Sequence, residues 1–181
     1  RDAYGFDNSP FLDYLETKGF FVAFGSHSNY LYTQASLASS LNMEYLDRAA
    51  SRLTSWDGVY KMLRGHAVGR LLQSAGYTFV HIGSWWDPTR TNRHADININ
   101  HAYLRRLPEF SVKLFETTAL SPLLALWLDP DREHWKEVQR QFDELARRPR
   151  LAGPSFVFAH VLAAHPVYVF DEHGRYLADR A

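Results

Sequence analysis

Residues 76–90 read GYTFVHIGSWWDPTR and contain both a predicted strand and the loop that follows it. The first part of this stretch, residues 77–82, is a short run of mainly aromatic and β-branched residues between two glycines, which predicts a buried strand. Residues 155–162 form a similar apolar run, and residues 20–24 form a third. A strand that faces water on one side alternates apolar with polar residues. These wholly apolar runs therefore predict a mostly parallel sheet with helices on both faces.

Helical patterns lie between the predicted strands. Residues 8–10 read Asn-Ser-Pro and mark the start of a first helix, and a second helix begins with Thr33 at or near its N-cap. Apolar residues between 60 and 75 fall on one helical stripe, which Gly76 terminates. A helix after residues 129–131 is expected to carry one apolar face, formed by Trp135, Val138, Phe142 and Leu145. This alternation predicts a single α/β unit over residues 1–181, which we expect to be an incomplete domain.

Composition narrows the classes of function. The chain has 181 residues, 46% of them hydrophobic, which is enough for one core of ordinary domain size. Its 20 basic and 20 acidic residues balance, so no nucleic-acid partner is expected. The absence of cysteine rules out disulfides, thiolate metal sites and a cysteine nucleophile.

No part of the sequence is a membrane or export signal. The longest apolar runs reach about half of the roughly 20 residues that a spanning helix needs. We therefore expect this chain on its own to be soluble and to carry no signal peptide. It begins at Arg1 without an initiator methionine, and both ends are consistent with cuts through a longer protein.

Three loops are expected to meet at one edge of the sheet. They begin at Gly25, Gly83 and Ala163, and each follows a predicted strand. Open α/β folds bind ligands where the carboxyl ends of parallel strands lie together. Thr33, the segment 85–90 and His165 are therefore predicted to converge.

Thr33 is the candidate nucleophile. At a helix N-terminus, the dipole and the free backbone N–H groups favour an attacking oxygen or a bound phosphate. The hydroxyl would also need a metal ion or a base to lower its pKa. The alternative is that Thr33 only caps its helix.

Two other places in the sequence carry candidate substrate-binding side chains. His165 follows an apolar strand and precedes proline, where an imidazole can donate to a phosphate oxygen or protonate a leaving group; a structural hydrogen bond is the alternative. The loop 85–90 combines indole rings, a hydroxyl and the Arg90 guanidinium, which suits an organic phosphate. Its alternative is an aromatic cover with Arg90 in a surface ion pair. We expect His160 to be a core histidine, and residues 171–174 to form a simple turn rather than a metal motif.

These segments resemble the alkaline-phosphatase-like superfamily, which includes sulfatases, phosphoglycerol transferases and lipoteichoic acid synthases. Residues 28–42, SNYLYTQASLASSLN, resemble the nucleophile segment, in which Cys, Ser or Thr opens a helix of small residues. Residues 74–78, SAGYT, with GSWW at 83–86 resemble the Ala-Gly-Tyr-x-Thr and Gly-Lys-Trp-His stretch of sulfatases. Residues 158–166 are similar to the strand that delivers a substrate-contacting histidine, here His165. The similarity covers most of the chain.

Departures from the family pattern narrow what the resemblance implies. Threonine at position 33 disfavours sulfate-ester hydrolysis, since sulfatases oxidise a cysteine or serine there, and favours the phosphoglycerol-transferring branch. Ser84 and Trp86 replace the sulfatase lysine and histidine, and Arg90 is expected to supply the lost positive charge. The resemblance implies a divalent metal (Mn, Mg or Zn) that contacts Thr33. The family's first-strand acidic ligand has no clear counterpart in Asp2, and no later Asp-His-Gly segment is present, so the remaining ligands are expected outside this chain.

The first interpretation is a metal-dependent phosphoryl or phosphoglycerol transferase or phosphodiester hydrolase. Thr33 attacks phosphorus, and Ser84, Trp86, Arg90 and His165 hold a small-molecule or lipid-linked ester. The alternatives are a sulfatase-like sulfuric ester hydrolase and a catalytically degenerate binding or structural module. The resemblance also implies a membrane-anchored parent protein with this domain on the extracytoplasmic face.

Overall fold

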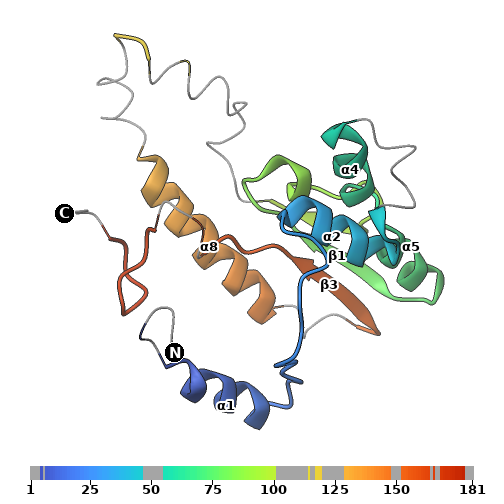
Figure 1. Cartoon of the computed structure of the whole chain (residues 1–181), viewed down its shortest axis with the longest axis horizontal. Coiled ribbons are helices and arrows are strands. Elements are labelled where there is room, and N and C mark those ends of the chain that lie inside the picture. The colour runs from blue at the N-terminus through green and yellow to red at the C-terminus, as the bar shows by residue number, and fades with distance from the viewer. Residues whose placement is uncertain are drawn as a thin grey trace.

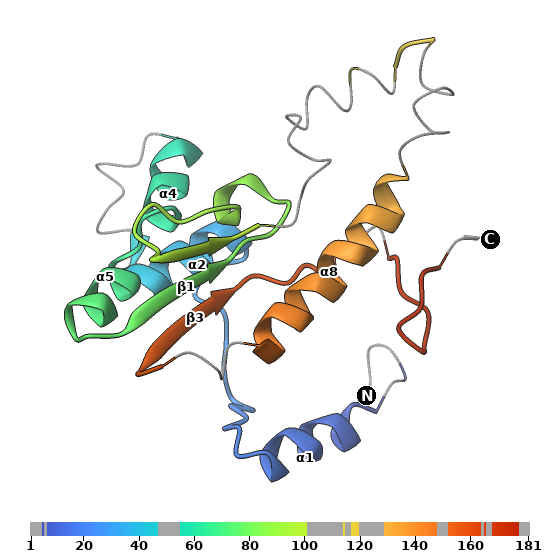
Figure 2. The same cartoon turned by 180° about the vertical axis from the view of Figure 1, so that it is seen from behind.

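A small parallel sheet organises the chain. The computed structural model describes residues 5, 7–46, 55–100, 114, 117–119, 129–147, 152–163, 165 and 168–177. Strands β1 (Thr78–Ile82), β2 (Ile97–Ile99) and β3 (Ser155–Ala159) pair in the order β2-β1-β3, and both pairs are parallel. The described α-helices are α1 (Ser9–Thr17), α2 (Thr33–Asn42), α4 (Trp56–Leu63), α5 (Ala67–Ser74) and α8 (Pro130–Arg147). Figures 1 and 2 show α2, α4 and α5 grouped beside the sheet. The prediction of an α/β fold with a parallel sheet is confirmed.

The central strand β1 is buried on both faces. Val80 and Ile82 point to one face, Phe79 and His81 point to the other, and none of the four exceeds 1% exposure. The Phe79 ring lies 5.2 Å from the ring of Phe156 on β3. Burying a large apolar side chain contributes about 1.5–3 kcal/mol, so β1 anchors this part of the core.

Helices α4 and α5 divide a segment for which a single helical stripe was predicted, and that prediction is wrong. The break lies at residues 64–66, where His66 becomes the N-cap of α5 and its Nδ1 accepts a hydrogen bond from the Gly69 N–H at 3.0 Å. A Cβ on Gly69 would lie 2.6 Å from the Phe79 ring, so the missing side chain lets α5 approach the sheet. Gly76 adopts a φ of +87° after α5, which confirms the predicted stop.

A second apolar cluster joins α2 to α4. Ala38, Val59 and Leu63 are buried there. The partly buried apolar side chains that pack against them include Trp86, which comes from the loop after β1. This contact ties α2 and α4 to the carboxyl end of the sheet.

Helix α8 buries a polar side, which contradicts the apolar face predicted for it. Phe142 is 54% exposed, whereas the buried positions, apart from Val138, are polar: His134, Glu137, Gln141 and Glu144. Gln141 explains part of this orientation, because its amide donates to the carbonyls of Gly83 (2.8 Å) and His160 (3.2 Å), which follow β1 and β3. Hydrogen bonding to the strand ends therefore orients this part of the helix.

The strand predicted for residues 20–24 is also wrong. The stretch has no strand partner among the described residues, and its backbone bonds are local, such as Phe20 N–H to Leu15 and Ser26 N–H to Ala23. Its aromatic rings are exposed, Phe21 at 91%. Both views show α1 standing apart from the sheet, and α1 has no buried residue (Figures 1 and 2). The loop beginning at Gly25 therefore does not leave a strand.

The C-terminal part confirms one prediction and corrects another. Residues 171–174 form a turn in which Gly174 adopts a φ of +77°. An antiparallel bridge between Phe170 and Tyr176 closes the turn. Strand β3 ends at Ala159, so His160 follows the strand instead of lying inside it. No helix within the described ranges is long and apolar enough to cross a membrane.

Candidate functional site

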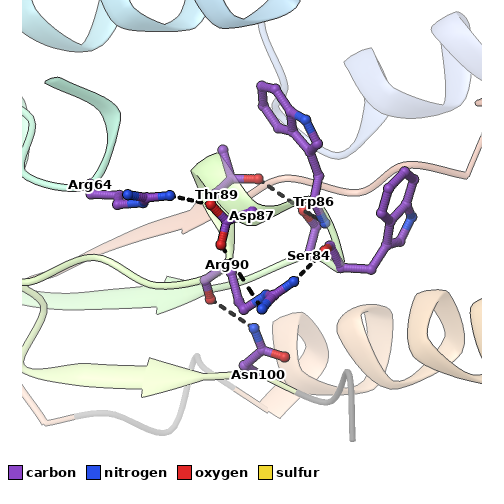
Figure 3. Close-up of polar contacts among 8 residues, drawn as sticks. Arg64, Ser84, Trp86, Asp87, Thr89, Arg90 and Asn100 are labelled. Carbon is purple, nitrogen blue, oxygen red and sulfur yellow. Dashed lines mark hydrogen bonds and ion pairs between the residues drawn. The ribbon is translucent and has the colours of Figure 1, made fainter. Parts of the chain in front are cut away.

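The loop after β1 is fixed by its own backbone and by β2. The Gly83 N–H donates to the Ile99 carbonyl at 2.8 Å, and the chain then turns through a 3-10 helix, η1 (Asp87–Thr89). The Asn100 amide donates to the Arg90 carbonyl at 2.8 Å (Figure 3). A Cβ on Gly83 would lie only 1.9 Å from that carbonyl oxygen, so this close approach requires glycine. Residues 84–90 are thereby held rigidly at the carboxyl edge of the sheet.

Two hydroxyls and an imidazole form a chain of hydrogen bonds in this loop. Ser84 Oγ lies 2.8 Å from Thr89 Oγ1, which lies 2.9 Å from His160 Nδ1. The Trp86 backbone N–H donates to Ser84 Oγ at 3.2 Å. Ser84 and Thr89 are 1% and 2% exposed, and His160 is half-buried. The loop after β1 is thus bonded to the residue that follows β3.

Burial disfavours the charged form of three histidines, His66, His81 and His160. Burial, followed by the nearby His165 and His81, lowers the pKa of His160 to about 4. Burial also lowers the pKa of His66 to about 4, with smaller contributions from His81, Arg70 and His94. The pKa of His81 is lowered by burial as well, although a hydrogen bond from its ring to the Thr89 carbonyl at 2.9 Å opposes that effect. Neutral imidazoles donate and accept hydrogen bonds without adding charge.

Two adjacent tryptophans each face a histidine. The ring of Trp86 lies 5.6 Å from that of His160 at 71°, and the ring of Trp85 lies 5.9 Å from that of His165 at 79°. Both pairs are edge-to-face contacts between the loop after β1 and the segment after β3. Trp86 also packs on the cluster of α2 and α4, so its indole joins three parts of the fold.

Arg90 is held inside its own loop. One Nη donates to the Trp85 carbonyl at 3.2 Å, and the other lies 3.9 Å from an Asp87 carboxylate oxygen. Asp87 is also paired with Arg64 (Figure 3). Because these carboxylate and guanidinium groups are substantially exposed, the ion pairs contribute little to stability. Arg90 brings a positive charge to the carboxyl edge.

Thr33 lies at the first position of α2, next to its N-cap Tyr32, and its side chain is exposed. Among the described residues, no hydrogen bond or ring contact joins Thr33 to Ser84, Arg90 or His165. Its link to the loop is indirect, through α2 packing against Trp86. The structure therefore brings Ser84, Trp86, Arg90 and His165 to one edge and leaves Thr33 outside their direct contacts.

The described residues do not themselves form a metal site. Within the described ranges, no group of three or more His, Asp or Glu side chains is placed to hold a metal ion. Asp2 lies outside the described residues.

Sequence reasoning missed two contributors to this site. His160 was expected to be only a core histidine, and Gln141 was not singled out, yet both join the ends of β1 and β3. The hydroxyl of the loop 85–90, that of Thr89, was predicted to help bind a phosphate. It is buried and lies within hydrogen-bonding distance of Ser84 and His160 instead. The available signal was a histidine directly after an apolar strand, which places a polar group where ligands bind.

Comparison with protein-family models, with curated proteins and with solved structures found no match to this chain. The superfamily resemblance therefore rests on the sequence motifs alone.

Proposed function

We propose that this chain belongs to a metal-dependent phosphoryl or phosphoglycerol transferase or phosphodiester hydrolase of the alkaline-phosphatase-like superfamily. The observation that carries the proposal is the group of side chains at the carboxyl edge of the sheet. Indole, hydroxyl, guanidinium and imidazole groups from residues 84–90 and 160–165 meet there. Open α/β folds bind their ligands at this edge.

The chemistry of these groups suits a phosphate ester. The Arg90 guanidinium supplies positive charge, and the neutral imidazole of His160 supplies an N–H donor to a phosphoryl oxygen. The indole rings of Trp85 and Trp86 offer an apolar surface to the organic part of the ester. In this proposal Trp86, Arg90 and His165 hold the substrate, whereas Ser84, predicted to contact it, is buried and supports the loop through its bonds to Thr89 and Trp86.

Thr33 is the proposed nucleophile. Its hydroxyl lies at the positive end of the α2 dipole and is open to solvent. A bond forms between Thr33 Oγ1 and phosphorus while the bond from phosphorus to the leaving alcohol breaks. The threonine hydroxyl loses its proton, and the leaving alcohol takes up a proton as it departs. Water or a second alcohol then removes the phosphoryl group from the threonine.

The metal requirement comes from the resemblance alone. A divalent Mn, Mg or Zn ion would supply the charge that lowers the pKa of the threonine hydroxyl. Apart from the proposed contact with Thr33, its ligands belong to parts of the protein outside the described residues. The extracytoplasmic, membrane-anchored setting of the parent is a proposal on the same footing.

The test is a turnover assay on the protein at its natural length. Phosphodiester and sulfate-ester model substrates are incubated with and without manganese, for the wild type, Thr33→Ala and Thr17→Ala. Thr17 is an exposed helical threonine at the end of α1 and serves as the matched control.

We expect manganese-dependent phosphodiester turnover that Thr33→Ala abolishes and Thr17→Ala preserves. Turnover of the sulfate ester alone would favour the sulfatase-like alternative. No turnover of either ester would favour a catalytically degenerate binding module.

A further inference from the structure

The orientation of the protons in the Ser84–Thr89–His160 chain follows from counting donors and acceptors. Ser84 is buried and accepts a hydrogen bond from the Trp86 N–H, so its own proton needs an acceptor. Within the described part of the chain, Thr89 Oγ1 is the acceptor in reach, at 2.8 Å. Ser84 therefore donates to Thr89.

The same reasoning applies one step further along the chain. Thr89 is 2% exposed, and its hydroxyl already accepts the Ser84 proton. Its own proton points to the other partner of that hydroxyl, the Nδ1 of His160 at 2.9 Å. Nδ1 is then an acceptor, and a neutral imidazole that accepts at Nδ1 carries its proton on Nε2.

The reverse orientation leaves a proton without a partner. If His160 donated from Nδ1 to Thr89, the single bond between Ser84 and Thr89 would use only one of their two hydroxyl protons, and the other would be buried with no acceptor among the described residues. Leaving a buried donor unsatisfied costs about 1–3 kcal/mol. The first orientation is therefore favoured by enough to fix one tautomer.

We infer that Thr89 holds His160 in the tautomer with its proton on Nε2, so that His160 presents an N–H donor to a phosphoryl oxygen of the substrate. This inference deepens the function proposed above and rests on it. No hydrogen bond involves Nε2 of His160 within the described ranges, and its ring lies beside Trp86 and near His165 at the carboxyl edge. Thr89 acts as a positioning residue, and His160 contacts the ligand.

Neutrality makes the tautomer matter. Burial keeps the pKa of His160 near 4, so the ring is uncharged at pH 7 and only one of its nitrogens can donate. A neutral N–H donor aligns the phosphoryl oxygen without adding a full positive charge. The anionic product is therefore bound less tightly and can dissociate. Arg90 supplies the charge at the same edge.

The first test is nitrogen NMR of the histidine rings at pH 7. We expect His160 to show one tautomer, protonated at Nε2. His66 serves as an internal reference, since the Gly69 N–H fixes its Nδ1 as an acceptor independently of Thr89. A proton on Nδ1 of His160 in the wild-type protein would overturn the inference.

Variants at position 89 test the positioning role. Thr89→Ser keeps the hydroxyl and should keep the single tautomer, whereas Thr89→Val removes it and should leave a mixture, with His66 unchanged. An unaltered single tautomer in Thr89→Val would show that Thr89 does not hold the ring. If that variant fails to fold, the wild-type spectrum still decides the orientation.

Inorganic phosphate tests the ligand contact. Titration should shift the Nε2 resonance of His160 and leave that of His66 in place. We expect His160→Gln, whose amide can reach the Nε2 position, to keep phosphate affinity within about threefold. His160→Asn should weaken it about tenfold, as expected for a lost hydrogen bond to a charged group.

An unshifted His160 resonance, or equal affinities of the two variants, would refute the contact. Phosphate binding at His160 without ester turnover would instead sustain the contact and reject the proposed catalysis.

Discussion

Replacing Gly83 with alanine should release the loop that carries Ser84, Trp86 and Arg90. The new Cβ would lie 1.9 Å from the Arg90 carbonyl oxygen, whereas ordinary contacts begin at 3.4 Å. The two groups must therefore separate by about 1.5 Å, the difference between these values. The obstacle is backbone, which cannot rotate away as the end of a side chain can.

The cost of this change has two parts. Overpacking of a tight site costs about 1–3 kcal/mol. Moving the Arg90 carbonyl also breaks its hydrogen bond from Asn100, now 2.8 Å, and disturbs the bond from the Ser84 N–H to Thr89, now 3.3 Å. Each is worth about 1 kcal/mol. We expect Gly83→Ala to lower the free energy of unfolding by about 3 kcal/mol, or Tm by roughly 6–12 °C for a chain of this size.

Urea unfolding and thermal melting measure this loss. Gly25→Ala is the matched control, because a Cβ at Gly25 meets nothing within 4 Å and its φ lies outside the left-handed region. Tryptophan fluorescence should also change in Gly83→Ala, since the loop carries Trp85 and Trp86. If the two variants were equally stable, the close packing of this loop against its own carbonyl would be refuted.

Other parts of the core give two further predictions. Stability should fall between about pH 6.5 and pH 4, because the unfolded chain binds protons at His66 and His160 in this window and the folded chain does not. For His66 the loss approaches about 3 kcal/mol below pH 4, since one pKa unit corresponds to about 1.4 kcal/mol. Urea titrations of His66→Asn, which keeps a capping acceptor, should show a shallower slope, and an unchanged slope would exclude His66 as the cause. Gln141→Leu should destabilise the fold by about 1–3 kcal/mol, because it leaves two carbonyls unpaired. Gln139→Leu loses one exposed hydrogen bond and should cost under about 1 kcal/mol. Equal losses of stability in thermal melts would argue against the buried role of Gln141.

Sequence reasoning identified β1, which is almost wholly buried, and β3, which is half-buried apart from the exposed Ser155. Both gave a signal because residues 77–82 and 155–162 are continuous, mainly apolar runs of strand length. Strand β2 escaped notice because it spans three residues, Ile97–Ile99, and its pattern is too short to distinguish from a loop. Residues 20–24 have the same composition as a buried strand, but composition does not reveal whether a partner strand exists.

Side-chain placement on helices was harder to foresee. The break at residues 64–66 depends on His66 capping α5 and on Gly69 approaching Phe79, and neither contact is visible in the spacing of apolar residues. The polar buried side of α8 depends on carbonyls at the ends of two strands, which lie far from Gln141 in the sequence. Hydrogen-bonding demands of the strand ends overrode the apolar pattern of the helix.

The candidate site, too, was predictable from the sequence only in part. The rule that parallel strands share one carboxyl edge correctly brought the loop 84–90 to the segment that contains His165. The bond between Thr89 and His160 spans 71 positions and could not be read from either segment alone. Thr33 was expected to converge with the loop through a strand at residues 20–24, and the absence of that strand explains why α2 reaches the loop only through packing on Trp86.

In the proposed function, Thr33 carries the phosphoryl group during turnover. Rapid-quench mass spectrometry of the natural-length protein, turning over a phosphodiester with manganese, tests this directly. We expect the peptide that contains Thr33 to gain the mass of the phosphoryl group together with the one ester group that the substrate retains, only with substrate and not in Thr33→Ala. Turnover that continues in Thr33→Ala, with no adduct on the wild-type peptide, would contradict the claim.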